Sequence, residues 1–377
     1  MVNEYQGKEP LRVLHLPVNV ADQAAALADA QRALGARCEV MEWEPHPFYP
    51  LVDHVCDERR PDMLSDVIRR ARWWSRARRD FDVVHLHAGA GIIPSPTVGN
   101  SLPSALKVRA LVRMAGLDVR SLRRAGVVTA VSFAGDDIRP LSDIAEHWDH
   151  AEEVLRAPEY GARQRTARRD YSLRLAARAD LVYVSTPDLL TTVPRARLLP
   201  QMPSRPVLPL RATSPRRRLG GPLRVLHAPS SGPVKGTSHV REAMASAHRQ
   251  AELELIVLSD VTADKIGAAL RGADLVVDQL NAGWYGTFAV EAMWTGTPVM
   301  ARIRSDLRPQ QTEAFAPIPV TSDTLADDLV RFSLLSVSEY EDVSARTIRF
   351  VDQSHSPAAL ARSVLDDYSR VRLRTGS

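Results

Sequence analysis

DQLNAGWYGTFAVEAM, residues 278–293, is the most informative part of this 377-residue chain. The apolar run at 275–277 predicts a short strand, which leads into a glycine-bearing loop and then into a helix with Glu291 in its early turns. Gly283 and Gly286 let the backbone approach a ligand without a Cβ atom in between. The free N–H groups of the loop and of the helix start favour an anion. Because Glu291 can accept hydrogen bonds from vicinal hydroxyl groups, the stretch as a whole indicates a nucleotide-sugar site.

Strands and helices alternate on both sides of this stretch. In the second half of the chain, apolar runs predict strands at 223–227, 253–258, 275–277 and 298–301, with helices at 237–248, 263–270 and 288–295. In the first half, they predict strands at 11–16, 38–43, 83–87, 127–133 and 181–184, with helices at 21–34, 62–79, 104–115 and 162–177. Such alternation is typical of parallel sheets with helices on both faces. The predicted fold class is therefore α/β, with one Rossmann-like domain in each half.

A proline-rich segment separates the two halves. Seven prolines lie between Pro194 and Pro222 inclusive, and proline at that density cannot continue a helix or a central strand. Ser356 before Pro357 predicts the start of a terminal helix, because the pair supplies a cap and a first-turn proline. These breaks predict a first domain at 1–200, a linker at 201–222, a second domain at 223–350, and a C-terminal helical segment at 351–377 that can pack back on the first domain.

The composition is that of a soluble globular protein and argues against several other classes of protein. The apolar content is 45% and the charged content 25%, and no apolar run reaches the ~18 residues that span a bilayer. The polar N-terminus does not look like a secretory signal. Cys38 and Cys56 form no disulfide framework, so the reducing cytoplasm is the expected compartment. A net charge of +4 does not indicate a nucleic-acid binder, whose positive charge would be concentrated in a stripe.

A second loop at the expected carboxyl edge of the same sheet carries a lysine. The segment HAPSSGPVKGT, residues 227–237, follows a predicted strand and brings Lys235 to the start of a helix. Ligands of open parallel sheets bind at the carboxyl ends of the strands, so Lys235 is placed to neutralise a diphosphate as a point charge. The alternative is a solvated loop lysine. Ser259 and Asp260 follow a further predicted strand, where they could flank a base or simply cap a helix.

Both loops resemble the donor-binding half of GT-B glycosyltransferases of the family 4 type. In that family a basic residue ahead of a glycine binds the donor diphosphate, and Lys235 matches it. The family also has a Glu-x7-Glu motif that ends in Glu-Ala-Met before a Gly-x-Pro-Val strand. Residues 291–293 and 296–299 match that end, so the resemblance implies that Glu291 binds the nucleotide ribose.

The resemblance extends to the first half of the chain, with less specific motifs. Residues 81–89 (FDVVHLHAG) are similar to the third-strand segment of the family, and 133–139 (FAGDDIR) to its Phe-His-Gly-Ser-Asp-Ile-Arg loop. Residues 179–188 resemble the strand at the end of the first domain. Together the similarity covers most of the chain from Leu11 to Ala301.

Three positions depart from the family pattern. The first glutamate of the motif falls on Gly283, the phosphate-binding arginine falls on Pro229, and the loop histidine falls on Ala134. These departures leave open which sugar the donor carries and whether the protein is active. The Gly283–Thr287 backbone must then hold the sugar and phosphate without the missing carboxylate.

The resemblance implies sugar transfer with retention, from a nucleotide-diphosphate sugar, in a cleft between two facing Rossmann-like domains and without a metal ion. The expected co-substrate is UDP- or GDP-linked, and no other cofactor is expected. Donor binding is predicted for Ser230, Ser231, Lys235, Gly236, Thr237, Gly283, Trp284, Tyr285, Gly286, Thr287 and Glu291. Catalytic roles are predicted for Lys235, Asp136, Asp137 and Arg139, and acceptor-side positions for Asn19, Val20, His87 and Gly135. Acids in a Gly-Asp-Asp turn also often cap backbone amides, and His87 is as well explained by a structural role.

Two further motifs have ordinary explanations. Asp80-Phe81-Asp82 has the form of a metal-binding motif but precedes a strand, so we interpret it as a strand-entry turn. No histidine or cysteine cluster has metal-ligand spacing in the sequence. The basic, Trp-containing helix at 64–79 has an apolar stripe, Leu64, Val67, Ile68, Ala71 and Trp74. We interpret the stripe as docked on the sheet; the alternative is a helix at a membrane surface or near an anionic acceptor.

Two other functions fit the same fold. A nucleotide-sugar epimerase would need acid/base carboxylates and a histidine around the sugar, and Gly283 and Ala134 argue against it. A non-catalytic partner that binds a nucleotide sugar is favoured by the three departures. Incubation with a nucleotide sugar would separate the three candidates. An epimerase changes the sugar, a transferase releases the nucleotide diphosphate, and a binder does neither. The sequence does not identify the acceptor, which can be a small aglycone, a sugar or a lipid-linked carrier.

Overall fold

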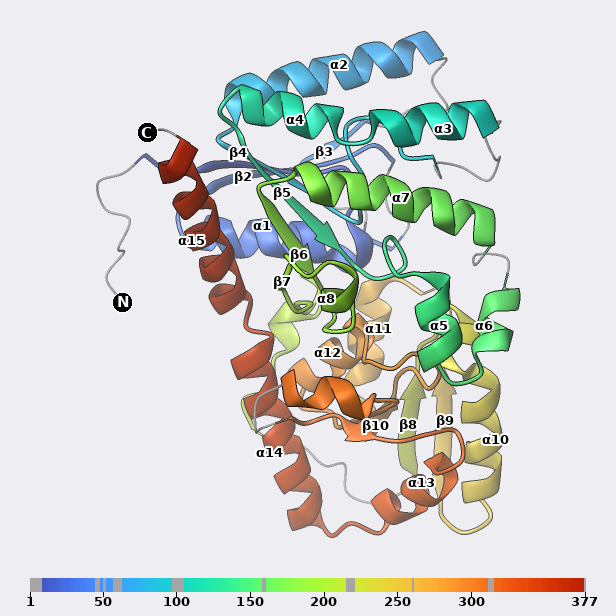
Figure 1. The fold of residues 1–377 in the computed structure, drawn as a ribbon. Helices are drawn as coiled ribbons and strands as arrows, with labels where there is room; N and C mark the ends of the chain where they lie inside the picture. Colours follow the sequence, from blue (N-terminus) through green and yellow to red (C-terminus); the bar gives the residue numbers. More distant parts are fainter. Residues whose placement is uncertain are drawn as a thin grey trace. The chain divides into compact units, whose positions relative to one another are not determined.

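The computed structural model describes residues 9–44, 48–49, 52–56, 63–96, 105–157, 161–214, 221–259, 261–310 and 315–375. The chain forms two compact units. The first unit comprises 1–140, 161–200 and 357–377, and the second comprises 141–160 and 201–356 (Figure 1). The terminal helix therefore belongs to the first unit. The division differs from the predicted one at 141–160, which group with the second unit although they precede the end of the first in sequence.

The first unit is built on a parallel sheet of seven strands in the order β3-β2-β1-β4-β5-β6-β7. The strands are β1 Arg12–Leu16, β2 Arg37–Glu42, β3 His54–Val55, β4 Val83–Leu86, β5 Val128–Phe133, β6 Leu181–Val184 and β7 Arg197–Leu198. The five inner strands confirm the predicted ones, because buried apolar runs are strong local signals. The two-residue edge strands β3 and β7 were not predicted, since so short a run leaves no periodicity to detect.

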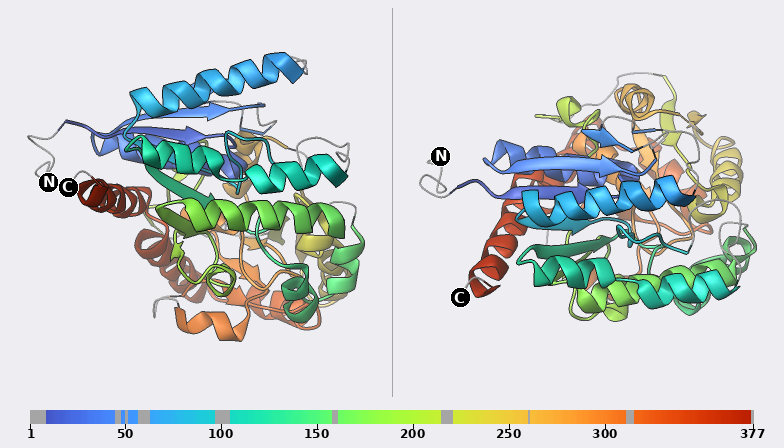
Figure 2. Two further views of the ribbon diagram at one scale, coloured as in Figure 1. Left: turned by 45° about the horizontal axis from the view of Figure 1, so that its top comes forward. Right: turned by 90° about the horizontal axis from the view of Figure 1, so that it is seen from above.

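Helices cover both faces of this sheet (Figure 2). They are α1 Gln23–Ala33, α2 Met63–Asp80, α3 Ala105–Met114, α4 Leu117–Arg124, α7 Ala162–Arg178, α8 Leu189–Thr192 and α15 Pro357–Thr375, with the short 3₁₀ helix η1 Val20–Asp22 before α1. Helices α2, α3, α4 and α7 lie side by side on one face, and α15 packs against α1. The predicted helices at 21–34, 62–79, 104–115 and 162–177 are confirmed within a few residues.

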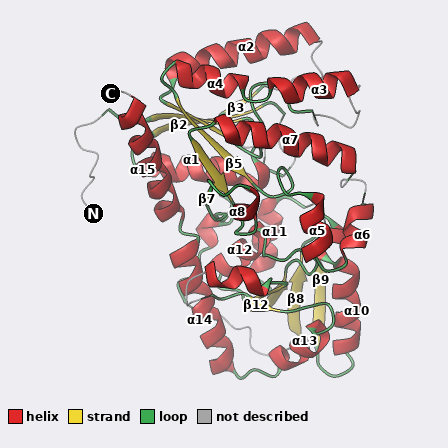
Figure 3. Ribbon diagram, viewed as in Figure 1, coloured by secondary structure: helices red, strands yellow, loops and turns green. Residues whose placement is uncertain are grey.

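The second unit is built on a parallel sheet of five strands in the order β12-β11-β10-β8-β9. The strands are β8 Leu223–His227, β9 Leu253–Val257, β10 Leu275–Val277, β11 Val299–Ala301 and β12 Ile318–Pro319. Its helices are α5 Leu141–His147, α6 Ala151–Arg156, α9 Gly232–Lys235, α10 Thr237–Ala247, α11 Ala263–Leu270, α12 Thr287–Trp294, α13 Leu325–Ser333 and α14 Val337–Ser354, with 3₁₀ helices η3 Leu208–Leu210 and η4 Ser305–Gln310 (Figure 3). The predicted strands and the helices at 237–248, 263–270 and 288–295 are confirmed.

Helix α12 lies at the centre of the second unit. Seven of its eight residues, Glu291 among them, are buried, so the helix that ends the 278–293 stretch is covered on every side. Part of its cover comes from the proline-rich segment: Val207 joins the core around α12, and the Trp294 indole donates to the Leu208 carbonyl at 3.0 Å. Residues 201–214 are therefore an ordered part of the second unit and not a free linker. None of the helices that the structure describes is long and apolar enough to cross a membrane.

Candidate functional site

The loops after β8 and β10 meet at the carboxyl edge of the second sheet, because these strands are hydrogen-bonded neighbours. Lys235 ends the short helix α9 and is buried, and its Nζ lies 2.5 Å from Oδ1 of Asp278. Asp278 directly follows β10, and its Oδ2 accepts a hydrogen bond from the Gly286 amide at 2.7 Å. An ammonium, a carboxylate and a backbone amide thus form one buried cluster. Asp278 begins the 278–293 stretch, but no pattern in the sequence predicts a role for it.

Two glycines pack closely against this cluster. A Cβ atom on Gly286 would stand 3.2 Å from the Lys235 Nζ, so the lysine would have to shift by a few tenths of an ångström. Gly236 has a φ of +66°, and a Cβ there would lie 3.0 Å from the Cβ of Leu280. Gly236 therefore lets the chain turn sharply after the lysine while the two loops stay in contact.

A buried histidine fixes the start of helix α10. The His227 Nδ1 lies 2.9 Å from the Val277 carbonyl, so this nitrogen donates, and Nε2 accepts from the Thr237 hydroxyl at 3.0 Å. Burial lowers the pKa of His227, which keeps the ring neutral. The Thr237 hydroxyl is thus committed to the fold, and a donor would meet the Thr237 backbone. Ser230 is exposed and Ser231 half-buried in the same loop.

Glu291 projects from the second turn of α12 and is buried. Its Oε1 accepts hydrogen bonds from the hydroxyl of Ser204 and, at 3.4 Å, from the Ser204 amide. Ser204 belongs to the proline-rich segment, where no pattern in the sequence singles it out. The carboxylate predicted to bind a ribose is therefore held in place by a residue 87 positions earlier in the chain.

Arg304 fills the space beside Gly283. A Cβ atom on Gly283 would lie 2.4 Å from both Cγ and Cδ of Arg304, and the Arg304 amide donates to the Gly283 carbonyl at 2.9 Å. The Arg304 guanidinium contacts Asp306 at 2.7 Å and Asp143 at 3.6 Å. Where the family resemblance led us to expect a carboxylate, this chain has a glycine covered by the stem of an arginine.

Replacing Gly283 with alanine is expected to destabilise the protein by about 1–3 kcal/mol, because the new Cβ displaces Arg304 from its ion pairs. Urea unfolding followed by tryptophan fluorescence measures the change. The double variant Gly283→Ala/Arg304→Ala should be more stable than the sum of the two single changes predicts. Gly232→Ala is the matched control, since a Cβ there has only one neighbour within 4 Å, at 3.9 Å. Additive effects of the two single changes would contradict the contact.

Trp284 and Tyr285 belong to the loop whose backbone is predicted to bind the donor, and their side chains lie in the core. They are 5% and 4% exposed and stack with ring centroids 4.9 Å apart. The Tyr285 hydroxyl lies 3.0 Å from the His355 Nε2, and His355 Nδ1 donates to the Gln201 carbonyl at 2.7 Å. Burial lowers the pKa of His355 to about 4. These aromatic residues anchor the glycine loop, and only their backbone remains available; Thr287, at the start of α12, is half-buried.

The first-unit loop 133–139 is tied together by its own charged residues. Asp137 is buried and accepts hydrogen bonds from the amides of Ala134 and Gly135 at 2.9–3.1 Å. Arg139 is 9% exposed and pairs with Asp188 at 2.8 Å. Asp136 is the exposed acid of the turn. Asp137 therefore caps backbone amides, which is the alternative to its predicted catalytic role. Asp136 is the carboxylate that this loop presents to solvent.

The predicted acceptor-side residues near β1 and β4 are mostly buried. The Asn19 side chain accepts from the Ala25 amide at 3.1 Å and donates to Asp22 at 3.0 Å, so it shapes the entry to α1. Val20 is exposed. His87 is 6% exposed and hydrogen-bonded to His15, which supports the structural alternative for this residue. Asp82 accepts from the Arg12 amide at 2.9 Å at the amino end of β4, as expected for a strand-entry turn.

The register of β1 and β4 brings His15, His85 and His87 together. Ligand atoms of the three side chains all lie within 4.8 Å of one another, which makes them a group that could hold a metal ion among the residues described. The spacing of histidines in the sequence could not reveal this group, because His15 lies on β1 and is paired with His85 on the neighbouring strand β4. Their nitrogens are hydrogen-bonded: His15 to His87 at 3.0 Å and Gln31 at 2.9 Å, and His85 to Tyr368 and Ser132 at 2.6 Å each.

Stability is expected to fall as the pH drops from about 6.5 to 4. Burial lowers the pKa of His15 to about 4 and holds those of His85 and His87 well below 6.5. The unfolded chain therefore binds protons that the native fold excludes, so this stability is complete above pH 6.5 and is lost below it. His15 alone corresponds to about 3 kcal/mol at pH 4. Urea midpoints at pH 8, 6.5, 5.5 and 4.5 measure the loss; midpoints that stay constant down to pH 4.5 would contradict it.

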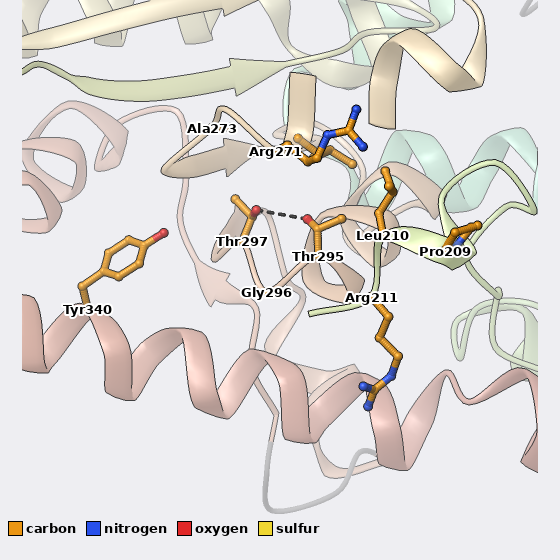
Figure 4. Close-up of a pocket in the computed structure, with 10 residues that line it drawn as sticks. Pro209, Leu210, Arg211, Arg271, Ala273, Thr295, Gly296, Thr297 and Tyr340 are labelled. Carbon is orange, nitrogen blue, oxygen red and sulfur yellow. Dashed lines mark hydrogen bonds between the residues drawn. The ribbon is translucent and has the colours of Figure 1, made fainter. Parts of the chain in front are cut away.

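A cavity of about 220 Å³ in the second unit lies away from the Lys235 cluster (Figure 4). Ala273 and Thr297 line it and precede β10 and β11, so it opens at the amino edge of the sheet. The hydroxyls of Thr295 and Thr297 bond to each other there at 3.1 Å. Since ligands of such sheets bind at the carboxyl edge, we assign the candidate site to the Lys235 cluster. Asp260, the other proposed base contact, lies outside the described residues.

No known family model matches the chain, and no curated protein sequence does. Solved structures match it across nearly its full length at low identity. Sucrose-phosphate synthase from Thermosynechococcus elongatus has a TM-score of 0.62 at 13% identity, over 96% of this chain and 99% of that one. HepE from Anabaena, solved with UDP and glucose, has a TM-score of 0.61 at 14% identity, over 96% of this chain and 100% of that one. AviGT4, a glycosyltransferase involved in avilamycin A biosynthesis, has a TM-score of 0.53 at 15% identity, over 97% of this chain and 98% of that one.

The matches span both sheets of this chain, the seven-stranded and the five-stranded one. Each sheet is one Rossmann-like unit, and the coverage shows that neither half is an insertion relative to the known folds. The chain has the GT-B fold found in nucleotide-sugar glycosyltransferases.

Proposed function

We propose that the protein is a retaining glycosyltransferase that transfers a sugar from a nucleotide-diphosphate sugar without using a metal ion. The observation that carries this proposal is the cluster of Lys235, Asp278 and the Gly286 amide at the carboxyl edge of the second sheet. The cluster supplies a cation and a glycine-framed backbone where open sheets bind ligands. HepE has been solved with UDP-glucose, and UDP is therefore the first nucleotide to test.

The proposed chemistry needs a group that stabilises the departing diphosphate. In the transfer, the bond between the anomeric carbon and the diphosphate oxygen breaks, and negative charge develops on that oxygen. A new bond forms between the anomeric carbon and an acceptor hydroxyl oxygen, whose proton passes to the leaving diphosphate or to solvent. The Lys235 ammonium and the amides of the glycine loop are the groups available to bind it. Glu291 is proposed to accept from the ribose hydroxyls. The first unit, which presents Asp136 to solvent, is proposed to bind the acceptor.

A nucleotide-sugar binder without transferase activity is the second candidate. It is favoured by two observations: Lys235 is already paired with Asp278, and Arg304 covers the glycine that stands where a sugar-binding carboxylate was expected. In such a protein the ammonium would be neutralised by Asp278 and would stabilise a leaving group poorly. The epimerase has no comparable support at this site.

Binding and turnover separate these candidates. Thermal unfolding with 1 mM UDP, GDP or ADP should show a rise of several degrees for one nucleotide, because a ligand at 100 times its Kd adds about 2.7 kcal/mol of stability. Incubation with the matching nucleotide sugar should then release free nucleotide diphosphate slowly, because water is the only acceptor of the sugar in that assay. Binding without release identifies the binder, and a changed sugar without release identifies an epimerase. If none of the nucleotides or nucleotide sugars raises the melting temperature, the proposed site is wrong.

A further inference from the structure

Positive charge is concentrated on one face of the first unit. The face is formed by α2, α3, α4 and α7, which lie side by side on the sheet (Figure 2). These four helices contain 18 of the 49 Lys and Arg residues and only 4 of the 45 Asp and Glu residues. The rest of the chain is therefore acidic, and the net charge of +4 conceals a strongly polarised molecule. We call these four helices the basic face.

The basic face also exposes aliphatic side chains. Six of the eleven large hydrophobic residues that are exposed in the described part of the chain belong to it: Leu64, Val67, Ile68, Leu106, Met114 and Leu117. Val67 is 58% exposed and Leu106 78%. We predicted that the apolar stripe of α2 docks on the sheet. The helix packs against the core only near Trp74 and Ala77, and the N-terminal part of the stripe faces solvent.

A groove runs between α3 and α7 on this face. It has a volume of about 540 Å³, with Val108 and Val112 among its apolar lining and four arginines around it, Arg109, Arg113, Arg163 and Arg174. All four arginines are exposed, and none forms an ion pair with a residue that the structure describes. These arginines form no ion pair within the described part of the protein, and exposed aliphatic residues lie beside them. Such a face is complementary to a surface that is both anionic and apolar.

We propose that the basic face docks on the surface of a membrane that contains anionic lipids. The arginines of the α3–α7 groove bind headgroup phosphates, and the aliphatic residues of α2, α3 and α4 enter the boundary between headgroups and acyl chains. Nucleic acid shares the phosphate chemistry but has no place for exposed aliphatic side chains. Trp73 and Trp74, which could stack on bases, are partly buried and each lie against an arginine. The docking is independent of the proposed transferase activity.

Vesicle flotation with the full-length protein tests the proposal. Vesicles of phosphatidylcholine with about 30% phosphatidylglycerol should carry the protein at 0.1 M salt, and pure phosphatidylcholine should not. The triple variant Arg109→Glu/Arg113→Glu/Arg163→Glu should bind at least about 100-fold more weakly, because each basic residue near such a surface contributes about fivefold. Val67→Gln/Leu106→Gln should weaken binding about tenfold at 0.5 M salt, where charge attraction is screened.

The matched control changes the same charge elsewhere. Arg249→Glu/Arg346→Glu/Arg349→Glu alters three exposed arginines of the second unit and should leave flotation unchanged. Equal loss in both triple variants would overturn the proposal, because binding would then follow net charge alone. So would failure of the wild-type protein to float with anionic vesicles. Binding to a 20-base-pair duplex that outcompetes the vesicles and ignores Val67→Gln/Leu106→Gln would assign the face to nucleic acid instead.

Discussion

The variant Lys235→Met is expected to lower kcat by at least about 100-fold, because a preorganised group that stabilises developing charge is worth about that much. Methionine keeps the aliphatic stem of the lysine and removes only the charge. The structure adds a second expectation. The Lys235 ammonium is the cation within 2.5 Å of the buried Asp278 carboxylate, so its removal should destabilise the fold by about 3–5 kcal/mol. Single-turnover release of nucleotide diphosphate and urea unfolding measure the two effects separately.

A double variant distinguishes catalysis from stability. Lys235→Met/Asp278→Asn leaves no unpaired charge, and the asparagine can still accept from the Gly286 amide. It should recover most of the lost stability and none of the activity. Lys265→Met, at an exposed lysine of α11 in the same unit, is the control and should change neither quantity. If the double variant regains wild-type turnover, Lys235 serves only to neutralise Asp278.

The variant Glu291→Gln is expected to raise the Kd for the donor nucleotide by about 10–100-fold with a smaller change in kcat, because hydrogen bonds to a charged group contribute about 1.5–3 kcal/mol. Both bonds from Ser204 go to Oε1 of the carboxylate, and glutamine keeps one oxygen acceptor while losing the negative charge. Isothermal titration with UDP and with free uracil base separates a ribose contact from a base contact. An unchanged Kd for UDP would contradict the assignment.

Ser204→Ala shows how far the proline-rich segment contributes. If Ser204 only orients Glu291, the variant should raise the Kd severalfold, and Glu291→Gln/Ser204→Ala should bind no more weakly than Glu291→Gln alone. Additive effects of the two changes would indicate that Ser204 contacts the nucleotide itself. Ser333→Ala is a suitable control, because among the residues described that hydroxyl bonds only to the Val330 carbonyl within its own helix.

Prediction from sequence succeeded for the elements and was less complete for the side chains around the site. The loops of Lys235 and Gly286 could be placed at one sheet edge, because each follows a buried apolar strand and contains the glycines that a close approach needs. Trp284 and Tyr285 lie in the same loop, yet they point into the core. Loop sequences with aromatic residues do not reveal the direction of a side chain, since burial depends on helices α12 and α14 packing around it.

From the sequence alone one can predict the alternation of strands and helices, the two parallel sheets, the loop of Lys235 after β8 and the helix of Glu291 after β10. These features depend on periodicity and on glycine and proline, which act over a few residues. The groups that those two residues meet depend on the tertiary structure. Asp278 is 43 positions from Lys235, and Ser204 is 87 from Glu291; Arg304 covers Gly283, and His15 reaches His87. Such contacts follow from strand register and helix packing, which no local pattern encodes.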